Sequence, residues 1–254
     1  MEVVSGDVTK ADTLPRALED IDVVIHLVGI IVEQGESTFQ EVHYHGTVNL
    51  VESVRRAGIK RFLHMSALGS RPDALTDYHK TKFQAEEYLR ASGLDFTIFR
   101  PSIILGPCDR FVKTFARMIR LSPLIILPKV RRGRLQPVWV GDVVDCFLQA
   151  LQQETTIGQT YELGGPEKLS LKQIVERISN HLGRKRFTIE VPMGLIRLGA
   201  TFLETLLSKP PVTREQLMML EENNTCDMEE VLRLFDIEHL AVDEGIQRSL
   251  RSSG

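Results

Sequence analysis

The sequence predicts an α/β protein with a doubly wound parallel sheet and a small, mostly helical C-terminal lobe. Short apolar runs alternate with helical patterns through the first half, which is typical of a parallel sheet covered by helices. Beyond about residue 108 this rhythm loosens and helical patterns dominate. We therefore expect one domain over residues 1–165, with 108–137 contributing to the lobe, and a second over 166–254.

The elements of the first half follow from its apolar runs. Val3 and Val4 are expected to end a strand, and residues 13–19 to form a short helix with Asp12 as its N-cap. The continuous apolar run 23–28 has the length and composition of a strand buried on both faces. The remaining elements expected here are strands at 61–65 and 96–99 and helices at 39–57 and 78–91.

The second half is expected to be richer in helices. Residues 124–127 are either an apolar loop or a short strand, and Gly141–Asp142 is expected to cap the helix that follows. The other expected elements are strands at 138–140 and 160–163 and helices at 111–121, 143–151, 170–182, 193–207, 213–221 and 228–235.

Composition narrows the classes of function. A net charge of −3 gives no reason to expect nucleic acid as a partner. The three cysteines form no C-x-x-C pair, which fits a reducing compartment. His43 and His45 have no accompanying carboxylate or cysteine cluster, so we expect no metal site. No secretory signal opens the sequence and no stretch is long enough to span a bilayer, so we expect a cytoplasmic protein.

One stretch is strongly basic, although the whole chain is slightly acidic. Between Asp109 and Arg134 the only acidic residue is Asp109 itself. The stretch is either a solvated face with a flexible loop, or a surface that meets phosphates, acidic lipid headgroups or an acidic partner protein. Peripheral contact with a membrane therefore stays open. The cations are Arg110, Lys113, Arg117, Arg120, Lys129, Arg131, Arg132 and Arg134.

A tyrosine and a lysine with Y-x-x-x-K spacing carry the clearest chemical signal. Tyr78 and Lys82 are four residues apart on an expected helix and therefore share a face. A lysine charge roughly 4 Å from the phenol would favour phenolate by at most about 4 kcal/mol, or about three pKa units. Ser66 ends the preceding strand, where a hydroxyl can meet a substrate carbonyl. Alternatively, Ser66 is a turn residue and the other two lie on an ordinary helix surface.

With these motifs in place, the chain resembles the short-chain dehydrogenases/reductases of the extended or atypical type. More narrowly, it is similar to the NAD(P)-binding accessory subunit of respiratory complex I and its bacterial relatives. The likeness is collinear from about Met1 to the end of the chain. The segments that carry it are 6–9, 24–29, 60–69, 100–107 and 136–142, with 211–217 matching the narrower group.

The resemblance implies a Rossmann-like fold that binds NAD or NADP. It places Asp7 and Val8 against the adenine ring, and it implies that the dinucleotide approaches the backbone at Gly29. The segment Pro101, Ser102 and Ile103 would pass beside the nicotinamide. Each has a plainer alternative: Asp7 caps a turn, Gly29 relieves crowding and Pro101 ends a strand.

The resemblance also implies roles in catalysis. Tyr78 would donate the proton, Lys82 would hold the nicotinamide ribose and lower the pKa of Tyr78, and Ser66 would orient a small-molecule substrate.

The family's opening strand, G-x-x-G-x-x-G loop and helix have no counterpart in the sequence. In the 3-2-1-4-5-6 strand order, Val3–Val4 would lose its neighbour and the strand near Val24 would present an open edge. We expect the native product or its ancestor to carry roughly 40 to 50 further residues, the size of a βαβ unit. Cofactor binding by the chain as given is then expected to be weakened or lost. The residues that choose between NAD and NADP are among the missing ones.

Three functions stay open from the sequence. The chain is an NAD(P)-dependent oxidoreductase or epimerase, or a non-catalytic nucleotide-binding or assembly subunit associated with respiratory-complex subunits. The third alternative is a truncated product that does not bind the cofactor.

Overall fold

The computed structural model describes residues 2–130, 133–206 and 213–251. The chain divides into two compact units. The first comprises Met1–Arg100 with Ala150–Tyr161, and the second comprises Pro101–Gln149 with Glu162–Gly254. The domain division predicted at residues 165 and 166 stays a prediction.

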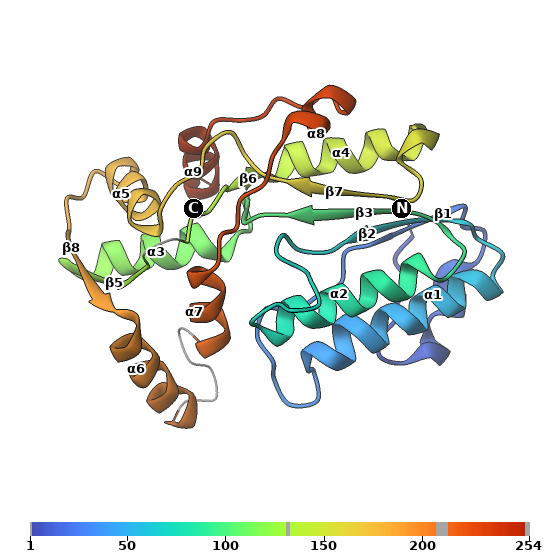
Figure 1. Ribbon diagram of the computed structural model, residues 1–254, viewed down its shortest axis with the longest axis horizontal. Helices are drawn as coiled ribbons and strands as arrows, with labels where there is room; N and C mark the ends of the chain where they lie inside the picture. The colour runs from blue at the N-terminus through green and yellow to red at the C-terminus, as the bar shows by residue number, and fades with distance from the viewer. Residues whose placement is uncertain (1, 131–132, 207–212, 252–254) are drawn as a thin grey trace. The chain divides into compact units, whose positions relative to one another are not determined.

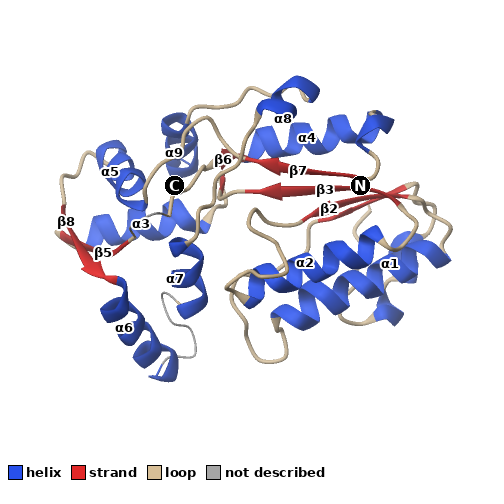
Figure 2. Ribbon diagram, viewed as in Figure 1, coloured by secondary structure: helices blue, strands red, loops and turns tan. Residues whose placement is uncertain are grey.

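A four-stranded sheet, in the order β1-β2-β3-β7, forms the centre of the fold (Figure 1). Strand β1 pairs in parallel with β2, and β2 pairs in parallel with β3. Helices α1 and α2 lie on the same side of this sheet (Figure 2). The arrangement confirms the predicted α/β class. The bounds are β1 Val23–His26, β2 Arg61–Met65, β3 Asp95–Pro101, β7 Gln159–Leu163, α1 Gly46–Arg56 and α2 Asp77–Arg90.

The core of the first unit lies between this sheet and the two helices. It is fully buried because the apolar face of each helix meets the apolar side chains of β2 and β3. Thr76 caps the N-terminus of helix α2, because its hydroxyl accepts the N–H of His79. Gly58 and Gly93 follow the two helices with φ of +78° and +77°, a conformation that favours glycine. The core side chains include Val51, Val54, Phe62, Leu89 and Ile98.

The first twenty residues differ from the prediction. Val3 is 84% exposed, and no strand in the described part of the chain pairs with Val3–Val4, so no strand forms there. Residues 13–19 do not form one helix. Two short 3-10 turns, Ala11–Thr13 and Pro15–Leu18, take its place, and Thr13 rather than Asp12 makes the local side-chain bonds.

Strand β1 is shorter and less buried than predicted. It ends at His26, and Ile25 remains 40% exposed because β1 is at the edge of the sheet. The helix expected over 39–57 begins with a π-helical segment, Gln40–His45, before α1. At this junction the hydroxyl of Thr47 donates to the carbonyl of His43.

The second unit contains two parallel strand pairs and most of the helices. Strand β4 (Ile104–Leu105) pairs with β6 (Val138–Trp139), and β5 (Leu124–Lys129) pairs with β8 (Phe187–Pro192). None of the described helices is long and apolar enough to cross a bilayer. The helices are α3 Arg110–Leu121, α4 Val140–Gln152, α5 Leu171–His181, α6 Met193–Leu206, α7 Arg214–Glu221, α8 Glu229–Leu234 and α9 Val242–Arg251.

Three features of the second unit differ from the prediction or were left open by it. Residues 124–127 are part of strand β5, whose partner β8 was not predicted. Helix α9 was not predicted either. Helix α4 already begins at Val140, so Asp142 lies inside its first turn. The Asp142 carboxylate accepts the backbone N–H groups of His239 and Leu240 instead of capping its own helix.

Candidate functional site

A stripe of four polar side chains runs along helix α2 at intervals of four residues. The stripe consists of Tyr78, Lys82, Glu86 and Arg90, which this spacing places on one face of the helix. Lys82 is 4% exposed and Glu86 is fully buried, so both charges lie inside the first unit. The sequence analysis identified Tyr78 and Lys82 but missed the continuation to Glu86 and Arg90.

Lys82 is a buried ammonium group with unused hydrogen-bonding capacity. Its Nζ donates to the carbonyl of Met65 at 3.1 Å, which is its one hydrogen bond within the described residues. An ammonium group has three N–H donors. Burial lowers the pKa of Lys82 to about 8, and the Glu86 carboxylate opposes this shift.

Gly29 lies directly against this ammonium group. A Cβ atom at Gly29 would stand 3.0 Å from Lys82 Nζ and 3.5 Å from His43 Nε2. A residue without a side chain therefore lets the backbone approach this charge closely. Two of the residues that the sequence analysis singled out, Gly29 and Lys82, are brought together here.

Tyr78 lies on the same face of α2 as Lys82 but packs against other aromatic rings. Its ring meets those of Phe39 and His43 edge to face, with centroids 5.7 and 5.2 Å apart. Burial raises the pKa of Tyr78 to about 12. The predicted lowering of this pKa by Lys82 is therefore not met, because desolvation of the phenolate is the dominant effect.

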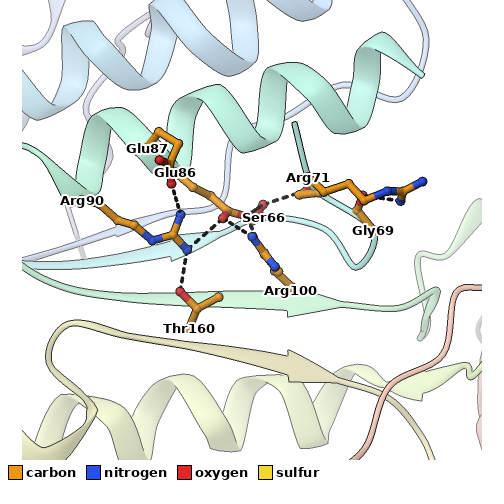
Figure 3. A network of polar contacts seen from close by, with 9 residues as sticks. Ser66, Gly69, Arg71, Glu86, Glu87, Arg90, Arg100 and Thr160 are labelled. Carbon is orange, nitrogen blue, oxygen red and sulfur yellow. Dashed lines mark hydrogen bonds and ion pairs between the residues drawn. The ribbon is translucent and has the colours of Figure 1, made fainter. Parts of the chain in front are cut away.

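Ser66 donates its hydroxyl proton to the carboxylate of Glu86 (Figure 3). Its oxygen also lies 3.2 Å from the hydroxyl of Ser70. Ser66 does lie at the end of β2, as predicted, but its proton is directed toward α2. Whether it orients a substrate stays a prediction.

Glu86 is the centre of the polar network drawn in Figure 3. Arg100 donates to both of its oxygens, at 2.9 Å from Nε and 2.6 Å from Nη2. Arg90 approaches the same carboxylate at 3.1 Å and also donates to Thr160 at 2.8 Å. The network therefore connects α2 to strands β3 and β7 and to Ser66, which follows β2, and it compensates a charge that would otherwise be costly to bury.

His43 fixes the loop that carries Gly29. His43 Nδ1 lies 3.0 Å from the hydroxyl of Thr81. His43 Nε2 lies 3.0 Å from the carbonyl oxygen of Ile30 and 3.1 Å from its N–H. Burial and the nearby Lys82 charge lower the pKa of His43 to about 3, so the ring is neutral.

Two further histidines lie under the site. His26 and His64 face each other across the β1–β2 pair, with stacked rings 5.2 Å apart. Burial lowers the pKa of His26 to about 3 and that of His64 well below its ordinary value. The described residues contain no group of three or more histidine, cysteine, aspartate or glutamate side chains placed to hold a metal ion. Sequence inspection missed His26 and His64 because buried strand positions are normally apolar.

Asp7 and Val8 have local structural partners. The Asp7 carboxylate accepts the N–H and hydroxyl of Thr9, which lowers the pKa of Asp7 and forms a turn. The Val8 carbonyl accepts from Asn49 at 2.9 Å, and its side chain packs against Gly46, where a Cβ would come within 2.9 Å. The predicted contact of Asp7 and Val8 with adenine stays a prediction.

The predicted segment beside the nicotinamide belongs to the second unit. The Ser102 hydroxyl donates to the side-chain carbonyl of Asn224, and the Ser102 N–H donates to the carbonyl of Leu163 at 2.8 Å. The Ile103 carbonyl accepts the N–H of Val138 at 2.9 Å, and Pro101 ends strand β3. The roles of these three residues toward a cofactor stay predictions.

Comparison with known proteins defines the class. Residues 1–107 match the family model described as NAD(P)H-binding. The fold is shared with the Bordetella bronchiseptica enzyme WbmG, solved in complex with NAD, at a TM-score of 0.73 and 15% identity over 99% of this chain and 78% of that chain. With the parallel sheet, these findings show a Rossmann-type fold, and the chain is similar to the extended short-chain dehydrogenases/reductases.

Within that class, the chain is related to an accessory subunit of respiratory complex I. It is 24% identical to the mitochondrial NADH-ubiquinone oxidoreductase 40 kDa subunit of Neurospora crassa, over 85% of this chain and 56% of that protein. It is 24% identical to the mitochondrial NADH dehydrogenase [ubiquinone] 1 alpha subcomplex subunit 9 of Arabidopsis thaliana, over 86% of this chain and 55% of that protein. The chain thus spans about half the length of these relatives.

Proposed function

We propose that the chain binds a nicotinamide dinucleotide, NAD or NADP, with the nicotinamide ribose held by Lys82 and Tyr78. The observation that carries the proposal is the buried ammonium of Lys82, which has one carbonyl acceptor and lies against Gly29. A ribose with two hydroxyls would supply the acceptors that the remaining N–H donors lack. The residues present therefore fit this end of the cofactor. When bound, the nicotinamide would supply hydride-transfer chemistry.

We further propose that the 254-residue chain alone binds the dinucleotide weakly. The Rossmann pyrophosphate site is a glycine-rich turn before a helix N-terminus, and no such turn precedes β1 in this sequence. Gly29, Tyr78 and Lys82 would contact only the nicotinamide end of the dinucleotide. This end is the same in NAD and NADP, so these residues do not distinguish the two cofactors.

Replacing Lys82 by methionine is expected to lower the affinity for NADH and NADPH about 10- to 100-fold, because a hydrogen bond from a charged donor is worth about 1.5–3 kcal/mol. Isothermal titration calorimetry at high nucleotide concentration measures the change. Lys80→Met is the matched control, since Lys80 is on the same helix but reaches solvent and pairs with Asp77. Equal affinities for Lys82→Met and Lys80→Met would contradict the proposal.

The role that best fits this site is nucleotide binding without turnover, within an assembly of respiratory-complex subunits. Ser66 already directs its proton to Glu86, and a phenol with a pKa near 12 is a poor proton donor or acceptor at neutral pH. The relatives named as complex I subunits support the choice of partner. Co-migration of the chain with respiratory subunits on native gels tests it.

The second candidate is an oxidoreductase or epimerase acting on a small molecule, which the shared helix face of Tyr78 and Lys82 favours. For the binding role we expect Tyr78→Phe to change NADH affinity by less than about fivefold, because a phenol that makes one exchangeable hydrogen bond contributes about 1 kcal/mol or less. We also expect no carbonyl-dependent NADH oxidation by the wild-type chain. Turnover that is abolished in Tyr78→Phe would establish the second candidate in place of the first.

A further inference from the structure

The two-stranded ribbon of β5 and β8 has one buried and one exposed face. On the inner face Ile125 is 1% exposed. On the outer face Leu124 and Ile126 are 39% and 50% exposed, and their register partners Phe187 and Ile189 are 80% and 50% exposed. Paired residues of neighbouring strands point to the same side of a sheet, so these four large apolar side chains share the outer face.

Neighbouring elements of the same unit extend this apolar surface. Leu121, at the end of α3 and three residues before β5, is 75% exposed. Helix α6, which follows β8 directly, exposes Leu195 and Leu198 at 62% and 70%. In Figure 1 the two strands and α6 lie together at one end of the second unit. We call Leu121, Leu124, Ile126, Phe187 and Ile189 the ribbon patch.

Cations flank the ribbon patch and outnumber the acids there. Residues 110–129 and 184–190 contain eight lysines and arginines and one acidic residue, Glu190, in a chain of net charge −3. Arg184 donates to the carbonyl of Arg120 at 3.1 Å, and Arg186 to that of Ile119 at 2.7 Å. These bonds hold the 184–186 segment, which leads into β8, against the C-terminal end of α3, so Arg120 and the basic residues 184–186 lie next to the patch.

We propose that the ribbon patch is a docking surface for an anionic lipid bilayer. Scattered exposed leucines are common, but a contiguous apolar face with a cationic border marks an interaction surface. The apolar side chains match the boundary between headgroups and acyl chains, and the lysines and arginines match the lipid phosphates. The outer face carries no polar side-chain atom that would orient a specific protein partner, and a fluid bilayer requires none. This surface is independent of the nucleotide site.

Sedimentation of the chain with vesicles tests the proposal. We expect binding to vesicles of phosphatidylcholine mixed with phosphatidylserine, weaker binding to phosphatidylcholine alone, and loss of binding as salt rises. Phe187→Ser is expected to weaken binding about tenfold, because it removes an inserted aromatic side chain. Lys185→Glu is expected to weaken it about fivefold or more, because each basic residue near an anionic surface contributes about that factor.

Two substitutions elsewhere on the second unit serve as matched controls. Leu232→Ser removes an exposed leucine of α8 and Lys168→Glu reverses an exposed charge, and both are expected to bind vesicles as the wild type does. The melting temperature of each variant shows that it is folded. No binding to the anionic vesicles at low salt, or equal losses in patch and control variants, would overturn the proposal. Association with a second copy or an acidic protein in place of vesicles would overturn it too.

Discussion

Replacing Glu86 by glutamine is expected to lower the free energy of unfolding by about 3–5 kcal/mol, the range measured when one partner of a buried ion pair is removed. Glu86 is fully buried, and its carboxylate receives two hydrogen bonds from Arg100 and one from Arg90. A glutamine of the same shape would remove the negative charge to which Arg100 and Arg90 donate. Urea unfolding at neutral pH, followed by circular dichroism, measures the change.

The adjacent carboxylate provides the control. Glu87 also pairs with Arg90, at 2.7 Å, but its side chain is 55% exposed. Glu87→Gln is therefore expected to change the free energy of unfolding by less than about 0.5–1 kcal/mol. Similar losses for Glu86→Gln and Glu87→Gln would show that the network in Figure 3 does not stabilise the fold as described.

Acidification below pH 6.5 is expected to destabilise the chain through its buried histidines. The pKa of His26 and of His43 is about 3 in the folded chain against 6.5 for an ordinary histidine, so the unfolded chain binds more protons between these values. Stability is therefore complete above the unfolded pKa and falls as the pH drops through this window. At a pH near 5 each of the two histidines lowers the free energy of unfolding by about 2 kcal/mol relative to neutral pH. Urea unfolding at neutral pH and near pH 5 measures the sum.

A non-titrating replacement isolates one of these contributions. In the wild-type chain the hydroxyl oxygen of Thr47 lies 3.1 Å from His26 Nε2. The glutamine of His26→Gln keeps an N–H donor for this oxygen but takes up no proton. We expect the loss of stability on acidification to be about 2 kcal/mol smaller in this variant. If His26→Gln lost as much stability on acidification as the wild type, His26 would not be a source of that loss.

The fold was largely predictable because its strands contain short runs of apolar, aromatic and β-branched residues. The run 61–65 is the strand β2, and the helix expected over 78–91 agrees with α2 to within one residue at each end. Prediction failed where a segment depends on a distant partner. Val3–Val4 has strand-like composition but no neighbouring strand among the described residues, and β8 forms a strand because β5 lies beside it.

The site was only partly predictable from spacing. The interval of four residues correctly placed Tyr78 and Lys82 on one helix face, yet it could not show that burial dominates the pKa of Tyr78. The binding of Ser66 to Glu86 was missed because the two residues are twenty positions apart. The stripe from Tyr78 to Arg90 was visible in the sequence, since it repeats the same interval, and it is the signal that would have revealed Glu86.

Saturation-transfer difference NMR with nicotinamide mononucleotide and adenosine monophosphate tests the nucleotide-binding account most directly, because it reports which half of the dinucleotide touches the chain. We predict transfer to the ribose and nicotinamide protons of the first ligand, retained in Lys80→Met and lost in Lys82→Met. Transfer that persists in Lys82→Met, or that appears with adenosine monophosphate alone, would contradict a ribose site built on Lys82 and Gly29.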